Sequence, residues 1–179
     1  MTRQFLIPII ARPPGIESSK KHRFQAPIVA PTRELAVLIH SLLIQTLQFH
    51  SSSSQGQYEH NRIIPQLVAR GTEAQDLSTF SSDSSNLLIG TPGGFRKLLA
   101  SPHIHASATR VLVLDEADKL LATDFKPDIA AILVFLPKQR QTGLFNASMD
   151  DFTRLDRIGL RNPVRVSVKR SRQRAAGQD

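Results

Sequence analysis

The sequence predicts an α/β fold in which a parallel β-sheet carries helices on both faces. Short apolar runs alternate along the chain with helical patterns, which is typical of βαβ units. One run, Arg110–Leu114, is almost entirely apolar, as expected for a strand buried on both faces. Polar and turn-forming residues follow several of these runs, at the strand ends where parallel sheets bind their ligands. We therefore expect the functional residues at the carboxyl ends of the strands.

The first half of the chain supplies two strands and two helices. Pro27–Ala30 is a short apolar run that Pro31 and Thr32 close. From Arg33 to Leu47 the apolar residues repeat with a period of 3.6, and Thr32 is a suitable N-cap, so this segment is an expected helix. Ile63–Ala69 is the next expected strand, and Glu73–Phe80 is a short expected helix.

The second half continues the same alternation. Thr91 and Pro92 predict the start of a helix after the third strand, because threonine caps a helix and proline is tolerated in its first turn. The remaining elements follow in chain order: strands at Asn86–Ile89, Arg110–Leu114, Thr142–Ala147 and Val164–Val168, and helices at Pro127–Leu136 and Asp151–Leu160.

Two polar segments are expected to be surface loops, and the end of the chain is expected to be disordered. The loops are Arg12–Arg23, with two prolines and a glycine, and Phe49–Asn61, with four consecutive serines. Residues 169–179 contain too little apolar surface to pack. The organisation expected is one lobe over residues 1–168 and a basic tail over residues 169–179.

Composition and charge exclude several classes of protein. The 179 residues are 40% hydrophobic, and the absence of cysteine excludes disulfides, thiolate metal sites and cysteine nucleophiles. The net charge is +8, and residues 154–179 alone hold 8 basic and 2 acidic residues. Such a tail attracts phosphate backbones or acidic partners, with a solvated terminus as an equal alternative. Apolar stretches such as Phe5–Ala11 and Val111–Leu114 are far shorter than the roughly 20 residues of a membrane span, so no membrane segment is expected.

The fourth strand is followed directly by carboxylates, in the order Asp115, Glu116, Ala117 and Asp118. At a nucleotide site the first carboxylate can hold Mg²⁺, usually through water, and the second can orient the water that attacks a γ-phosphate. An acidic start to a helix, favoured by the helix dipole, explains the same residues equally well. This turn alone does not decide between the two interpretations.

Four strand-end turns together resemble the DEAD-box RNA helicases. They are Pro31-Thr32-Arg33-Glu34-Leu35-Ala36, Thr91-Pro92-Gly93, Asp115-Glu116-Ala117-Asp118 and Asn146-Ala147-Ser148. The resemblance extends from about Phe5 to Val168 and implies most of the first of the family's two RecA-like lobes. The run Gly159–Val166 is similar to the subgroup that acts on precursor ribosomal RNA during large-subunit assembly. That placement implies a nuclear, nucleolar protein whose partners are RNA and pre-ribosomal particles, with no membrane partner.

The resemblance implies roles for the matching residues. Asp115 would hold Mg²⁺ through water, Glu116 would position the hydrolytic water, and Asp118 would connect the ATP site to the coupling segment Asn146-Ala147-Ser148. The residues that would contact the RNA backbone are Pro31, Thr32, Arg33, Glu34, Gly71, Thr91, Pro92 and Gly93. Backbone contacts of this kind predict binding that is largely independent of RNA sequence. Arg33 as an exposed helix-start residue, and Asn146 and Ser148 as helix caps, are the simpler alternatives.

The sequence also departs from the family pattern. ATP binding in this fold uses a glycine-rich loop that ends in Gly-Lys-Thr or Gly-Lys-Ser, and none of the nine glycines here is followed by lysine. In the family's register the chain starts inside that loop, so we expect the sheet to lack the N-terminal strand and the phosphate loop. We also expect this chain to lack the second lobe. Gly94 stands where the family has arginine, Arg70 replaces the first glycine of a Gly-Gly pair, and Asn146 and Ser148 replace serine and threonine.

Two functional hypotheses follow. In the first, the chain is a fragment of an ATP-dependent RNA helicase that couples ATP hydrolysis to RNA remodelling, and the chain alone does not hydrolyse ATP. In the second, it is a genuine short module that binds RNA or an assembly partner without catalysis. The intact Asp115–Asp118 motif favours the first hypothesis. Gly94, Asn146 and the missing phosphate loop favour the second.

Overall fold

The computed structural model describes residues 3–11, 23–53, 63–68, 73–122, 124–146, 164 and 166. The strands are β1 (Ala26–Val29), β2 (Pro65–Val68), β3 (Leu87–Gly90), β4 (Val111–Asp115) and β5 (Gln141–Phe145). The helices are α1 (Arg3–Ala11), α2 (Arg33–Ser53), α3 (Glu73–Asp83), α4 (Pro92–Ala100), α5 (Ala117–Leu120) and α6 (Lys126–Phe135), with a 3-10 turn at Ala106–Ala108. None of these helices is both long and apolar enough to cross a lipid bilayer.

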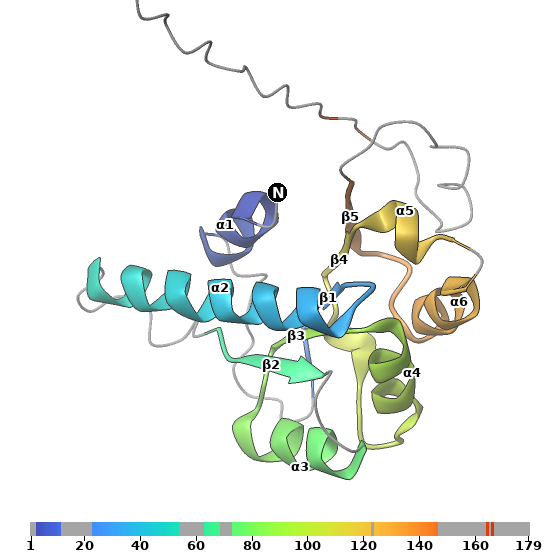
Figure 1. Cartoon of the computed structure of the whole chain (residues 1–179). Helices are drawn as coiled ribbons and strands as arrows, with labels where there is room; N and C mark the ends of the chain where they lie inside the picture. Colours follow the sequence, from blue (N-terminus) through green and yellow to red (C-terminus); the bar gives the residue numbers. More distant parts are fainter. Residues whose placement is uncertain are drawn as a thin grey trace, which may run out of the picture.

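The five strands form one parallel sheet in the order β2-β3-β1-β4-β5. The predicted α/β fold is therefore confirmed, and each of the five strands lies within two residues of its expected bounds. Since β1 pairs with β3 on one side and with β4 on the other, the first strand of the chain occupies the centre of the sheet. Figure 1 shows the helices that connect the strands lying on either side of this sheet.

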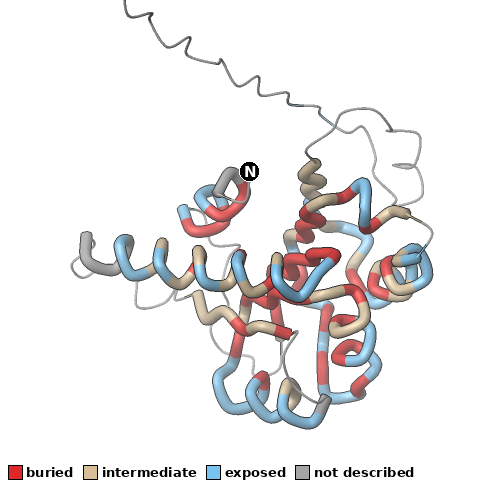
Figure 2. Tube along the Cα trace, in the orientation of Figure 1, coloured by how far each residue is buried: buried red, intermediate tan, exposed pale blue. Residues whose placement is uncertain are grey.

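Alternating side chains of the strands divide the core into two clusters, one on each face. Ile28, Ile89 and Val113 face α1 and α2, whereas Val29, Leu88 and Leu112 face α3, α4, α5 and α6. This period of two is the expected geometry of a strand, and here both faces are apolar because both are covered. Figure 2 shows buried residues concentrated in the sheet and exposed residues on the outer sides of the helices.

Helix α1 was not among the expected elements, because Pro8 interrupts its apolar run. The helix contains Pro8 nonetheless and turns that residue toward solvent. Phe5, Leu6, Ile9 and Ile10 form its buried side, and Phe5 packs on Phe145 of β5 with ring centroids 4.8 Å apart. Burial of these four side chains outweighs the helix-breaking tendency of one proline.

The expected loop at Phe49–Asn61 is partly wrong, because α2 continues to Ser53. The segment was assigned to a loop for its lack of apolar residues, but polarity alone does not end a helix. No glycine or proline follows Leu47 before Gly56, and each added residue extends an existing helix by one hydrogen bond. The rest of that loop, the loop at Arg12–Arg23 up to residue 22, and the helix at Asp151–Leu160 lie outside the described residues. So does the strand at Val164–Val168, except for Val164 and Val166, which are exposed.

Candidate functional site

The carboxyl ends of all five strands lie along one edge of the sheet, because every strand is parallel to its neighbours. The register aligns Val68 with Gly90, Gly90 with Val29, and Val29 with Leu114. Asp115 is in turn aligned with Phe145. The turns that follow these residues therefore lie side by side, at intervals of about 4.8 Å between adjacent strands. We call this row of strand ends and turns the carboxyl edge.

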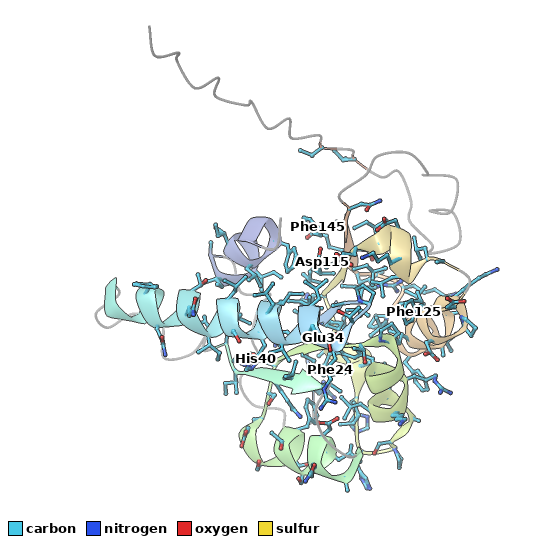
Figure 3. All side chains as sticks on the ribbon, in the orientation of Figure 1. Phe24, Glu34, His40, Asp115, Phe125 and Phe145 are labelled. Carbon is cyan, nitrogen blue, oxygen red and sulfur yellow. The ribbon has the colours of Figure 1, made fainter. Side chains whose placement is uncertain are left out.

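Asp115 ends β4 and is a buried carboxylate, with 4% of its surface exposed. Its Oδ1 accepts a hydrogen bond from the backbone N–H of Glu116 at 3.1 Å. Burial raises the pKa of Asp115 above its ordinary value of 3.8, and the hydrogen bond from Glu116 opposes that shift in part. Within the described residues no lysine or arginine pairs with this carboxylate. Figure 3 shows Asp115 close to Phe145, at the ends of β4 and β5.

Glu116 connects β4 to α5 in a left-handed backbone conformation, with φ 50° and ψ 52°. This region is uncommon for residues other than glycine, and such residues cluster at functional sites. The first turn of α5 holds Glu116 in place, since its carbonyl oxygen accepts from the N–H of Lys119 and its Oε2 accepts from Lys119 Nζ at 2.9 Å. The same side-chain bond raises the pKa of Lys119. The result is a carboxylate beside Asp115 that is bonded to Lys119.

Asp118 and Asn146 both lie at this end of the sheet, but the structure does not bond them to each other. Asp118 is an exposed residue of α5, and Asn146 directly follows β5. The Oδ1 of Asn146 is buried and has no hydrogen-bond partner among the described residues. Ala147 and Ser148, the rest of the expected coupling segment, lie outside the described residues.

The turn after β1 leads directly into α2. Pro31 is buried, while Thr32, Arg33 and Glu34 are exposed at the start of the helix. Thr32 caps α2 as the sequence predicted, since its Oγ1 accepts from the N–H of Leu35 at 3.3 Å and its carbonyl oxygen from that of Ala36 at 3.1 Å. Glu34 is labelled at this end of α2 in Figure 3. An arginine and the start of a helix are thus presented beside the end of β1.

The turn after β3 leads into α4 in the same way. Thr91 is the N-cap, with its Oγ1 accepting from the N–H of Gly94 at 3.4 Å, and Pro92 is the first helical residue. The predicted cap is confirmed. The turn after β2 contains Gly71, which lies outside the described residues.

Two glycines allow β2 to approach the start of α4 closely. A Cβ atom on Gly90 or on Gly94 would lie closer than 3.0 Å to the backbone oxygen of Val68. Gly93 is different, because a Cβ there would only touch Asp128 Oδ2 at 3.9 Å. Gly94 therefore fits a position where the structure has no space for a side chain.

Sequence reasoning missed three residues at this edge. Lys119 could have been found, because a lysine three residues after a glutamate commonly pairs with it on a helix. Arg96 of α4 and Asp128 of α6 form an ion pair with Arg96 Nε 2.7 Å from Asp128 Oδ1. No local pattern relates these two residues, since they are far apart in the sequence and meet only through the packing of α4 on α6.

The arrangement along the edge separates two sets of residues. The expected RNA contacts follow the neighbouring strands β2, β3 and β1, and the expected nucleotide and coupling residues follow β4 and β5. The first set offers helix starts and Arg33, which suit phosphate oxygens. The second set offers carboxylates, which suit a hydrated Mg²⁺ ion and a nucleophilic water.

The model of the DEAD/DEAH box helicase family matches residues 2–155. This chain belongs to the DEAD/DEAH box helicase family. The expected family is therefore confirmed, and the paired carboxylates after β4 are its Asp-Glu-Ala-Asp motif.

Similar proteins extend this assignment. A protein of Botryotinia fuckeliana, named ATP-dependent rRNA helicase spb4, is 48% identical over 185 residues, which cover 94% of this chain and 30% of that protein. A protein of the same name from Phaeosphaeria nodorum is 44% identical over 205 residues, covering 99% of this chain and 32% of that protein. A DEAD box protein of Methanococcus jannaschii has a solved structure that matches with a TM-score of 0.63 at 24% identity, over 83% of this chain and 36% of that chain. This match shows the RecA-like fold. The chain spans about 30% of the length of the rRNA helicases it resembles.

Proposed function

We propose that this chain is part of the first lobe of an ATP-dependent RNA helicase that remodels ribosomal RNA precursors during large-subunit assembly in the nucleolus. The observation that carries the proposal is the division of the carboxyl edge. Helix starts and Arg33 follow one group of neighbouring strands, and Asp115 and Glu116 follow the other. Both sets lie on one sheet, so a nucleotide site and an RNA surface would be directly connected. The names of the most similar relatives support rRNA as the substrate.

Asp115 fits the role of a Mg²⁺ ligand. It is buried, and among the described residues it has no cationic side chain to balance its charge, so a bound cation would compensate the unfavourable burial. No group of three or more potential metal ligands gathers within the described ranges, so the ion's remaining ligands would be waters and phosphate oxygens. When bound, Mg²⁺ supplies charge neutralisation for the phosphates. Glu116, fixed by Lys119, would accept a proton from the attacking water.

The residues of this chain do not form a complete ATP site. Phosphate binding in this fold depends on a loop that ends in Gly-Lys, and the sequence has no glycine followed by lysine. We therefore expect the 179-residue chain to hydrolyse no ATP. Phosphate release that is stimulated by RNA and abolished by Glu116→Gln would contradict this expectation.

A second function has its own support. Asn146 replaces a hydroxyl residue in the coupling segment, and its buried Oδ1 has no partner among the described residues. The replacement of that hydroxyl residue favours a module that binds RNA or an assembly partner without catalysis. The helicase function, and the module in its RNA-binding form, both require RNA binding at the β2, β3 and β1 end of the carboxyl edge.

Binding of a 20-nucleotide single-stranded RNA, followed by fluorescence anisotropy between 50 and 200 mM KCl, tests that requirement. Arg33→Ala removes an arginine at the carboxyl edge. Arg110→Ala removes an exposed arginine just before β4, at the opposite edge of the sheet. We expect Arg33→Ala to weaken RNA binding by about 3- to 10-fold. The slope of log K against log[KCl] should also fall by about one, because one phosphate contact is lost. Equal effects of the two substitutions would reject the carboxyl edge as the RNA surface.

A further inference from the structure

The ion pair between Arg96 and Asp128 lies beside the expected RNA contacts at the start of α4. Nε of Arg96 is 2.7 Å from Oδ1 of Asp128, and the two side chains are 55% and 27% exposed. The other ion pair between described residues, Lys119–Glu116, joins neighbours on one short helix. The Arg96–Asp128 pair instead connects two helices that pack together on one face of the sheet.

Asp128 bonds Arg96 close to the first turn of α4. While Oδ1 binds Arg96, the other oxygen, Oδ2, lies 3.9 Å from the place where Gly93 would carry a Cβ. Helical side chains point back toward the start of their helix, which brings Arg96 toward the turn before it. The carboxylate of Asp128, with Arg96 bonded to its other oxygen, thus lies near Gly93, one of the residues expected to face RNA.

Gly94, the third residue of α4, occupies a position with no space for an arginine side chain. The resemblance to RNA helicases implies an arginine at position 94, and the sequence has glycine there. A side chain at that position would meet the backbone oxygen of Val68, because a Cβ would lie closer than 3.0 Å to it. The close approach of β2 and an arginine at position 94 are therefore incompatible in this chain.

We propose that Arg96, held in place by Asp128, supplies the cationic phosphate contact that Gly94 cannot provide. The inference rests on the proposed function and adds a binding residue to the RNA surface. A guanidinium suits this role because it presents several donors in one plane to the oxygens of a phosphate. Asp128 is the positioning residue, since it restricts the arginine before RNA binds and so lowers the entropic cost of the contact.

The alternative is an ion pair that only connects α4 to α6. Three substitutions distinguish the two roles in the full 179-residue chain. Arg96→Ala removes the charge and breaks the pair. Asp128→Asn breaks the same pair but keeps the guanidinium. Lys97→Ala removes the same charge from the next residue, which is also exposed.

The measurement is binding of a fluorescein-labelled 20-nucleotide oligouridine by anisotropy, at KCl concentrations from 50 to 200 mM. We expect Arg96→Ala to weaken binding by about 3- to 10-fold at 50 mM KCl and to lower the slope of log K against log[KCl] by about 0.7, the value for one phosphate contact on a single strand. Asp128→Asn should weaken binding by no more than about twofold and leave that slope unchanged, because the guanidinium remains but is no longer held in place. Lys97→Ala should leave the affinity within about twofold of that of the unmodified chain. Thermal unfolding of each variant shows whether the pair alone affects stability.

Equal RNA affinities for Arg96→Ala and Asp128→Asn would overturn the inference, because they would trace the effect to the broken pair. Equal RNA affinities for Arg96→Ala and Lys97→Ala would also overturn the inference, because the loss of affinity would then come from the lower net charge and not from the position of Arg96. Both outcomes leave the proposed function intact when the unmodified chain binds RNA with a clear salt dependence. An unmodified chain that binds no RNA would reject both proposals together.

Discussion

At the residue scale, Asp115 shows a conflict between stability and function. A carboxylate that binds Mg²⁺ must be ionised, but the site buries it without a cationic side chain among the described residues. Burial raises the pKa of Asp115, so ionisation of this residue works against folding. A residue that is needed for binding commonly makes the folded protein less stable than an uncharged substitute at the same position would.

We therefore predict that Asp115→Asn stabilises the chain at neutral pH. The asparagine keeps the oxygen that accepts from the N–H of Glu116 and removes the buried charge. The thermal midpoint should rise by about 2–4 °C, which corresponds to about 1 kcal/mol for a chain of this size. Asp118→Asn, at an exposed position three residues later, is the matched control and should change the midpoint by less than about 1 °C.

The same variant gives a prediction on pH. The pKa of Asp115 is raised in the folded state, so the folded protein binds more protons than the unfolded chain just above pH 3.8. Stability contributed by this residue therefore falls as pH rises through that interval and is constant at higher pH. The advantage of Asp115→Asn should be small near pH 4 and full by pH 7, as measured by urea unfolding at each pH. An advantage that shrinks with rising pH would contradict the sign of the shift.

At the element scale, the sequence predicted those strands and helices that show a clear apolar period or a capping residue. The five strands, the Thr32 and Thr91 caps and the parallel arrangement could all be derived in this way. Helix α1 could not, because Pro8 opposes it locally and its stability comes from contacts with distant residues. For the same reason, the sequence could not predict the close approach of Val68 to Gly94 or the Arg96–Asp128 pair. Both depend on how separate elements pack.

The docking of α1 on the sheet can be tested directly. Phe5 is 3% exposed and packs on Phe145, whereas Ile7 of the same helix is 58% exposed. Phe5→Ala should lower the free energy of unfolding by about 3–5 kcal/mol, and Ile7→Ala by less than about 1 kcal/mol. Urea unfolding monitored by circular dichroism measures both. Similar small losses for the two variants would mean that α1 contributes little to the core.

At the scale of the whole molecule, β5 forms one border of the sheet. Among the described residues it pairs with β4 alone, so within that part of the chain no strand pairs with its other side. Unpaired strand edges promote association between molecules, and natural proteins often protect them with lysine.

We predict that Gln141→Lys slows association. Gln141 is the exposed first residue of β5, and Gln139, also exposed, lies just before the strand, so Gln139→Lys makes the same change of charge outside it. Light scattering at tens of micromolar protein should increase several-fold more slowly for Gln141→Lys than for Gln139→Lys. Equal rates for the two variants would attribute the effect to net charge and not to the strand edge.

The central position of β1 has a consequence for synthesis of the chain. The strand is made early, but its partners β3 and β4 follow about 60 and 80 residues later. At roughly 5–20 residues per second, β1 waits on the order of 4–16 s on the ribosome before both neighbours have been translated. Ile28 and Val29, which are fully buried in the finished sheet, are without these partners throughout that interval. The nascent chain thus carries its central strand before the sheet that will bury it exists.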